Sequence, residues 1–215
     1  AVLRDPEVLG SALDIVGAYL KNYAVDKAAA VVESVLPTCR QKGGLWLLKA
    51  LNHLATVRMK QARPEEALTA LEEVNAYATM NLSPQQREDA WEFWETVYRN
   101  FGWVLSSLGR EDEAIDYIQR AIDVKERVGL PPSWFDLWDL GRMRAATALR
   151  REDQDGIRDS QSLVTRALWL HRDAEPGDLV MRAKLWHSVG ECSFALGHLA
   201  ERAGAGPAAG PEARA

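Results

Sequence analysis

Apolar residues recur at intervals of three and four along most of the chain, the spacing that places them on one face of an α-helix. Residues 47–55 and 115–124 show the pattern most clearly. No run alternates apolar and polar residues with a period of two, and no Asn-Gly hairpin turn occurs. The pattern therefore predicts an all-α protein.

Helix-start signals divide this pattern into segments. Asp5-Pro6 provides a cap followed by proline, and Ser83 with Gln86 forms a capping box. Ser133, which has Asp136 three residues later, repeats the signal. Together with short polar breaks, these signals predict about nine helices at residues 6–21, 25–40, 44–61, 64–79, 84–108, 111–128, 133–150, 156–171 and 179–197.

One segment carries a recognisable repeat pattern of aromatic, small and helix-ending residues. It consists of Tyr98, Phe101-Gly102, Leu105, Leu108-Gly109, Ala114, Ile118 and Ala121. This order closely resembles the tetratricopeptide repeat motif. The resemblance implies that Gly102 and Ala114 lie where two paired helices cross, because only small side chains permit close approach there. Gly109 then supplies the backbone freedom that ends the first helix.

Fainter copies surround this repeat, around Ala12–Val35, Leu51–Val74 with Ala67, and Trp186–Gly197 with Gly190. These copies follow one another at intervals near 40 residues, and such extended-helix repeats are somewhat similar to those of the kinesin-light-chain-like branch of the family. The resemblance implies an all-α, right-handed superhelical solenoid of antiparallel helix pairs, with about 4–5 repeats in residues 1–202. The remaining Ala/Gly/Pro-rich tail, residues 203–215, is expected to be disordered because it lacks bulky apolar residues.

The resemblance also implies that the first helix of each repeat lines a concave groove. The polar and aromatic residues that this register places there are Lys49, Asn52, Thr56, Lys60, Arg99, Asn100, Trp103, Arg142, Lys184 and His187, with Glu191 beside them. The set is net basic and suits an acidic or carboxylate-bearing peptide. A solvated helix face explains the same residues equally well. Leu13 and Gly17 replace the Lys and Asn with which some relatives clamp chaperone tails, so that partner is not expected.

The formal net charge of −5 argues against nucleic acid as a partner, and no stretch is apolar enough to enter a membrane. Cys39 and Cys192 are isolated, which indicates buried free thiols and an intracellular, reducing compartment. The 8 tryptophans, including the Trp91–Trp94 cluster, are interpreted as packing between helices.

Catalytic and metal-binding patterns are not found. No two of the 4 histidines have the four-residue spacing of helical zinc motifs. His187 and Glu191, one turn apart, are read as an exposed hydrogen-bonded pair. No enzyme activity, cofactor or metal site is therefore expected.

The sequence thus predicts a scaffold or adaptor that binds another protein through a peptide, a helix or an acidic segment. One alternative is a structural or assembly-factor subunit that packs through its terminal helices. Another is a regulatory domain that senses a small ligand or peptide inside the superhelix.

Overall fold

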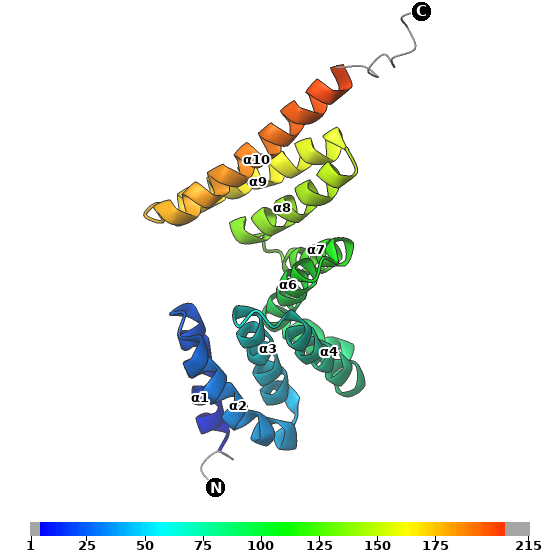
Figure 1. Ribbon diagram of the computed structural model, residues 1–215. Helices are drawn as coiled ribbons and strands as arrows, with labels where there is room; N and C mark the ends of the chain where they lie inside the picture. Colours follow the sequence, from blue (N-terminus) through cyan, green and yellow to red (C-terminus); the bar gives the residue numbers. More distant parts are fainter. Residues whose placement is uncertain (1–4, 205–215) are drawn as a thin grey trace, which may run out of the picture. The chain divides into compact units, whose positions relative to one another are not determined.

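A computed structural model describes residues 5–204 of the chain, and over this range the fold is all-α (Figure 1). The described residues form ten helices and no strand. Their bounds are α1 Pro6–Lys21, α2 Val25–Lys42, α3 Gly44–Lys60, α4 Pro64–Asn81, α5 Pro84–Asp89, α6 Trp91–Ser107, α7 Glu111–Arg127, α8 Trp134–Arg150, α9 Gln154–Ala174 and α10 Leu179–Gly204. None of these helices is long and apolar enough to span a membrane.

The chain divides into two compact units, residues 1–130 and residues 131–215. In the first unit, α1 packs on α2, α3 on α4, and α6 on α7, each as a pair of consecutive helices. Two apolar clusters pack α1, α2 and α3 together. Val16, Leu20 and Val32 contribute to one, and Leu9 and Leu13 to the other.

Small residues lie where α6 and α7 cross, as the repeat pattern predicts. Gly102 and Ala114 are both buried. A Cβ atom built on Gly102 would lie 2.5 Å from Cδ1 of Ile118 and 3.2 Å from the carbonyl oxygen of Ala114. The two helices therefore approach too closely for any larger residue at position 102.

The second unit repeats this geometry and adds a third helix. A Cβ on Gly141 of α8 would lie 2.7 Å from Val164 and 3.0 Å from the carbonyl oxygen of Ser160, both on α9. Helix α10 packs on α9 and, less extensively, on α8. Its buried face closes two apolar clusters, which contain Leu137, Ala148, Ile157, Ala167, Leu168, Leu185, Cys192, Ala195 and Leu199.

The opposite face of α10 has no helix against it within the described chain. Trp186 is 55% exposed and Phe194 is 80% exposed. A Cβ on Gly190 would meet nothing within 4 Å, in contrast to the crowded Gly102 and Gly141. The face of α10 that contains Gly190 is therefore open, whereas the crossings at Gly102 and Gly141 are each covered by a paired helix.

Most helix boundaries lie within two residues of the prediction, and the main differences are a break within 84–108 and the greater lengths of α9 and α10. The segment 84–108 breaks at Ala90, which leaves the helical conformation with φ −96° and ψ 33°, so that α5 and α6 are separate. Helix α9 begins at Gln154 because Asp153 caps it by accepting a 3.0 Å hydrogen bond from the Gly156 amide. Helix α10 continues past Gly197, since an exposed glycine weakens a helix without ending it.

Helix α10 reaches Gly204, and the rest of the expected tail, residues 205–215, lies outside the described residues. The single repeat domain over residues 1–202 stays a prediction beside the two compact units.

Candidate functional site

Two of the predicted groove residues, Lys49 and Lys60, are exposed on α3 in the first unit. The Lys60 ammonium group lies 4.8 Å from the ring centre of Tyr23, which is itself 82% exposed. Both lysine side chains are accessible to solvent. The two lysines can therefore attract a carboxylate on a partner.

Three further polar residues of the predicted groove, Asn52 and Thr56 on α3 and Asn100 on α6, contact one another. Asn100 donates a 2.8 Å hydrogen bond to Oδ1 of Asn52, and its amide nitrogen is 3.3 Å from Oγ1 of Thr56. Asn52 is 7% exposed and Asn100 is 6% exposed. These groups therefore hold α3 against α6, and a partner would meet the exposed lysines before it reached the amides.

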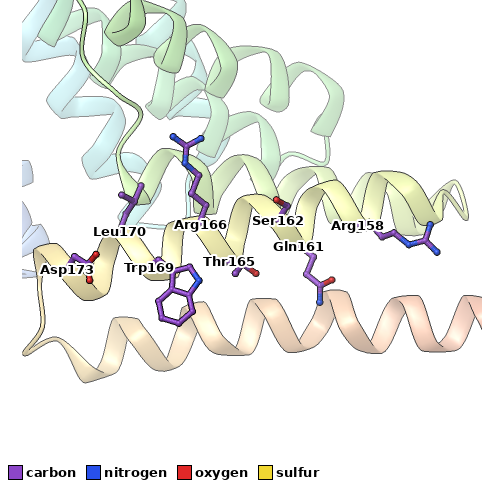
Figure 2. A pocket seen from close by; sticks show the side chains of 8 residues that line it. All are labelled: Arg158, Gln161, Ser162, Thr165, Arg166, Trp169, Leu170 and Asp173. Carbon is purple, nitrogen blue, oxygen red and sulfur yellow. The ribbon is translucent and has the colours of Figure 1, made fainter.

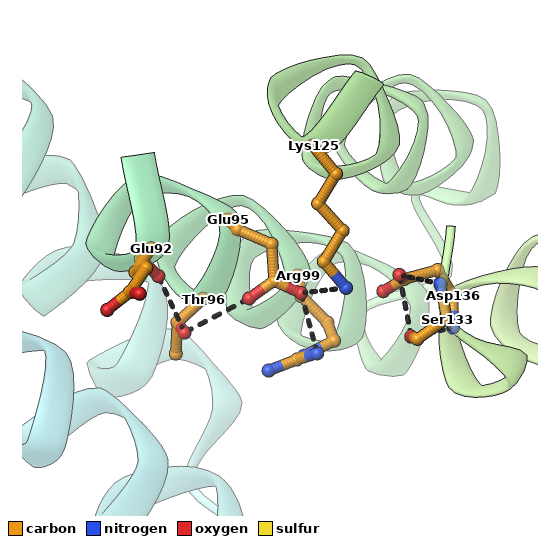
Figure 3. Close-up of polar contacts among 7 residues, drawn as sticks. All are labelled: Glu92, Glu95, Thr96, Arg99, Lys125, Ser133 and Asp136. Carbon is orange, nitrogen blue, oxygen red and sulfur yellow. Dashed lines mark hydrogen bonds and ion pairs between the residues drawn. The ribbon is translucent and has the colours of Figure 1, made fainter. Parts of the chain in front are cut away.

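Arg99 is held by a buried carboxylate, as Figure 3 shows. Its guanidinium donates a 2.8 Å hydrogen bond to Oε1 of Glu95, and the Lys125 ammonium from α7 lies 3.3 Å from the same oxygen. Glu95 is 6% exposed. The Arg99 guanidinium also lies 5.9 Å from the ring centre of Trp103. Two cations from two helices thus share one buried carboxylate, which links α6 to α7.

In the second unit, α8, α9 and α10 line an open pocket of about 290 Å³. Apolar side chains form most of its wall, and Arg142, Ser188 and Glu191 supply the polar groups; the full lining is Arg142, Ala145, Ala146, Leu149, Ile157, Val164, Ser188, Glu191, Cys192 and Ala195. Arg142 is exposed, and its nearest carboxylate, Asp139, is 3.7 Å away. A pocket of this kind can receive one apolar side chain of a partner protein while Arg142 pairs with a neighbouring carboxylate of the same partner.

The remaining predicted residues are on α10. Lys184 and His187 are exposed, and Nε2 of His187 lies 3.4 Å from Oε1 of Glu191. Trp138 of α8 donates a 3.0 Å hydrogen bond from its indole nitrogen to Oγ of Ser188, which fixes α10 against α8. Glu191 of α10 and Arg142 of α8 therefore line the same pocket.

A hydrogen-bonded cap positions α8, which carries Arg142. Ser133 accepts a hydrogen bond from the Asp136 amide, and the Asp136 carboxylate accepts one from the Ser133 amide (Figure 3). Asp136 is 1% exposed. The start of the helix, and with it the register of Arg142, is thereby fixed.

The exposed surface of α9 has a broader depression, shown in Figure 2. All eight lining residues come from this one helix, and Gln161 and Trp169 point toward α10 while Arg166 and Leu170 point away. Trp169 is 47% exposed. Because a single helix cannot surround a ligand, we place the candidate site in the pocket that α8, α9 and α10 line together.

The two cysteines are buried free thiols. Burial raises the pKa of both Cys39 and Cys192, and the carboxylate of Glu191 raises that of Cys192 further. A thiol with a raised pKa is a weak nucleophile at neutral pH. The prediction of two buried free thiols is confirmed.

The sequence interpretation missed the apolar part of the pocket. Ala145, Ala146 and Leu149 lie on α8, where the repeat register is weakest, so no groove position was assigned to them. Leu149 is 43% exposed in the structure. An exposed leucine one turn from two alanines was the available signal, although such residues are also common on ordinary helix surfaces.

Comparisons with known proteins agree with this architecture. Residues 46–127 match the family model of the tetratricopeptide repeat. Among curated proteins, none matches the chain. Among solved structures, the nearly identical TPR-like repeats attributed to a kinesin light chain of Podosopora anserina align with a TM-score of 0.63 and 16% identity, over 92% of this chain and 90% of that chain. A variant of those repeats aligns with a TM-score of 0.63 and 17% identity, over 93% and 94%.

Identities this low show a shared fold alone, and that fold is a TPR-like solenoid. The predicted all-α architecture of antiparallel helix pairs is confirmed, and so is the resemblance to tetratricopeptide repeats.

Proposed function

We propose, on the premise that residues 46–127 contain tetratricopeptide repeats, that this chain is a scaffold that binds an acidic segment of a partner protein. Repeats of this kind generally serve as surfaces for protein–protein interaction. The proposed site is the pocket lined by α8, α9 and α10, which takes an apolar side chain of the segment. Arg142 and Lys184 then pair with acidic residues next to it.

The observation that carries the proposal is the composition of this pocket. Its wall is apolar at Ala145, Leu149 and Ala195, and the exposed Arg142 lies at the same cavity. Hydrogen bonds from a guanidinium to a carboxylate are about twice as strong as neutral ones, and bidentate geometry adds specificity. The pocket therefore favours a segment with one bulky apolar residue beside an acid.

The exposed lysines on α3 give the first unit the same preference for acidic segments. Lys49 and Lys60 are exposed on a chain whose formal net charge is −5. Local positive charge on an acidic chain attracts acidic segments and repels basic ones, and such attraction mainly raises the rate of association.

Peptide selection followed by affinity measurement tests the proposal. Peptides that bind the 215-residue chain are selected by phage display, and the affinity of a selected peptide is measured by fluorescence anisotropy. We expect the selected peptides to combine an acid with a bulky apolar residue. The double variant Arg142→Glu/Lys184→Glu should weaken binding by about tenfold or more, and added salt should weaken binding to the unaltered chain.

The matched control reverses two exposed cations on α9, outside the pocket, as Arg158→Glu/Arg166→Glu. This variant should keep the affinity within about twofold, since it changes net charge equally without touching the pocket. Circular dichroism melting verifies that both variants fold. Equal loss in both variants, or selected peptides without acids, would contradict the assignment of the pocket.

A second function, as a structural subunit of a larger assembly, is favoured by the uncovered face of α10. Trp186 and Phe194 are exposed there, and Gly190 has the open space that Gly102 and Gly141 lack. The occupant would be a helix of a neighbouring protein that packs on α10 as α7 packs on α6. Light scattering on the complex purified with its native partners distinguishes the two functions. If the chain is a structural subunit, Trp186→Glu/Phe194→Glu releases it from the assembly, and Arg142→Glu/Lys184→Glu does not.

A further inference from the structure

His171, in the last turn of α9, is a buried histidine whose ring makes no hydrogen bond. It is 0% exposed, and both Nδ1 and Nε2 are buried without a partner among the described residues. The indole ring of Trp134 lies edge-on to the imidazole, with ring centres 4.7 Å apart. Buried polar atoms in folded proteins are nearly always paired, so this imidazole lacks an expected partner.

Two carboxylates from the turn between α9 and α10 lie close to the imidazole. Oδ2 of Asp178 is 3.9 Å from Nε2 of His171, and one donor atom each of His171, Glu175 and Asp178 all lie within 4.8 Å of one another. The other carboxylate oxygen of Asp178 accepts a 2.9 Å hydrogen bond from the Met181 amide at the start of α10. This bond orients Oδ2 toward the histidine.

Backbone hydrogen bonds hold the three residues together. The Glu175 amide donates to the His171 carbonyl at 2.8 Å, and the Asp178 amide donates to the Glu175 carbonyl at 3.1 Å. The spacing of the donor groups is therefore set by the turn that joins α9 to α10 (Figure 1).

The carboxylates of Glu175 and Asp178 are not neutralised by basic side chains of the described residues. Within residues 5–204, neither Glu175 nor Asp178 forms an ion pair with lysine or arginine. Arg182, one turn after Asp178, donates its guanidinium hydrogen bond to the Pro176 carbonyl oxygen. Both carboxylates thus keep oxygens available beside a buried nitrogen lone pair.

We propose that His171, Glu175 and Asp178 bind a divalent transition-metal ion such as Zn²⁺. Nε2 of His171 and one oxygen of each carboxylate are the ligands, and water takes the fourth position. Tetrahedral zinc with bonds of about 2.0–2.2 Å separates its ligand atoms by about 3.4 Å. The side chains of Glu175, which is exposed, and Asp178, which is partly exposed, close this gap by rotation.

The ion would connect the end of α9 to the start of α10. Since α10 forms one wall of the pocket that contains Arg142 and Glu191, the metal also stabilises that wall. The site needs neither cysteine. Mixed nitrogen and oxygen ligands favour Zn²⁺, Co²⁺ or Ni²⁺ over Mg²⁺ and Ca²⁺, which prefer oxygen alone.

Titration of the metal-free 215-residue chain with ZnCl₂ in a calorimeter tests the proposal. We expect one Zn²⁺ per chain and no heat from MgCl₂. At a free zinc concentration of about 100 times Kd, Tm should rise by about 5 °C. Co²⁺ should give d–d absorption of a tetrahedral ion without the charge-transfer band of a thiolate ligand.

Two substitutions at accessible positions report on the site without altering the buried imidazole. Glu175→Gln removes a ligand from an exposed side chain, and Asp178→Asn removes another while asparagine still caps α10. Each should lower zinc affinity by about tenfold or more and leave the metal-free Tm within about 1 °C. Such a result supports the site.

The matched control is His187→Asn/Glu191→Gln, which removes the exposed histidine–carboxylate pair on α10. Zinc affinity should be unchanged in this variant. The proposal is overturned if the unaltered chain takes up no zinc, if Glu175→Gln and Asp178→Asn bind zinc normally, or if the control variant loses it.

Discussion

The side-chain amide of Asn100 on α6 donates a 2.8 Å hydrogen bond to the side-chain oxygen of Asn52 on α3, 48 residues earlier in the chain. Both residues are less than a tenth exposed. The pair therefore joins the first helices of two successive repeats through a buried polar contact.

Asn52→Ala should destabilise the first unit by about 1–2 kcal/mol, because it leaves the buried Asn100 amide with only Thr56 as a long acceptor. Urea unfolding followed by circular dichroism measures the change. The double variant Asn52→Ala/Asn100→Ala should lose less free energy of unfolding than the sum of the losses in the two single variants. Simple additivity would show that the hydrogen bond contributes nothing.

Gly102→Ala should destabilise the α6–α7 pair by about 1 kcal/mol, since the cost of overpacking exceeds the gain in helix propensity. The new Cβ would lie 2.5 Å from Ile118 and 3.2 Å from the Ala114 carbonyl oxygen. Thermal or urea unfolding gives the value.

Gly190→Ala is the matched control on α10, where the added Cβ meets nothing within 4 Å. It should stabilise the second unit by about 0.5–1 kcal/mol, the ordinary gain for replacing glycine inside a helix. The same sign for both substitutions would refute the steric interpretation of the Gly102 crossing.

Arg99→Glu should unfold the protein at lower denaturant concentration, with a loss of about 2 kcal/mol, because it places a second carboxylate beside the buried Glu95. The substitution Arg40→Glu removes an exposed ion pair with Glu73, and it should change the free energy of unfolding by less than about 0.5 kcal/mol. A loss of partner binding in Arg99→Glu would thus report on folding as well as on the groove.

His53 should make stability depend on pH. Burial lowers its pKa from 6.5, the cation of Lys49 lowers the pKa further, and Asp14 opposes this. The unfolded chain therefore binds the proton more readily than the folded chain, so stability is complete above pH 6.5 and declines as pH falls below it. His53→Gln should narrow the difference in unfolding free energy between pH 7.5 and pH 5.5. An unchanged difference would assign the pH dependence to other groups.

The helix starts could be predicted because the signals are local. The Ser83–Gln86 and Ser133–Asp136 caps act over three residues, and the structure has both. The Gly102–Ala114 crossing was also predictable, since the repeat motif places small residues where paired helices meet. The break at Ala90 was missed because no proline or glycine marks it.

The site residues were harder to predict. Lys49, Lys60, Arg142, Lys184 and His187 are exposed, as groove residues must be, but their register alone does not show whether a partner binds them. Asn52 and Asn100 had the same register signal and turned out to be buried against each other. Whether a polar side chain faces solvent or a neighbouring helix depends on the distance between helices, which no single helix encodes.

The amino-acid sequence by itself determined most of the helices, the pairing of consecutive helices and the small residues at the α6–α7 crossing, because these follow from periodicity, caps and steric size within short segments. Only the tertiary structure decided that the Arg142 pocket forms between three helices, and that His171 meets Glu175 and Asp178 across a turn. The physical reason is that pockets and ligand clusters depend on distances between side chains of different elements. Those distances are set only when the helices pack.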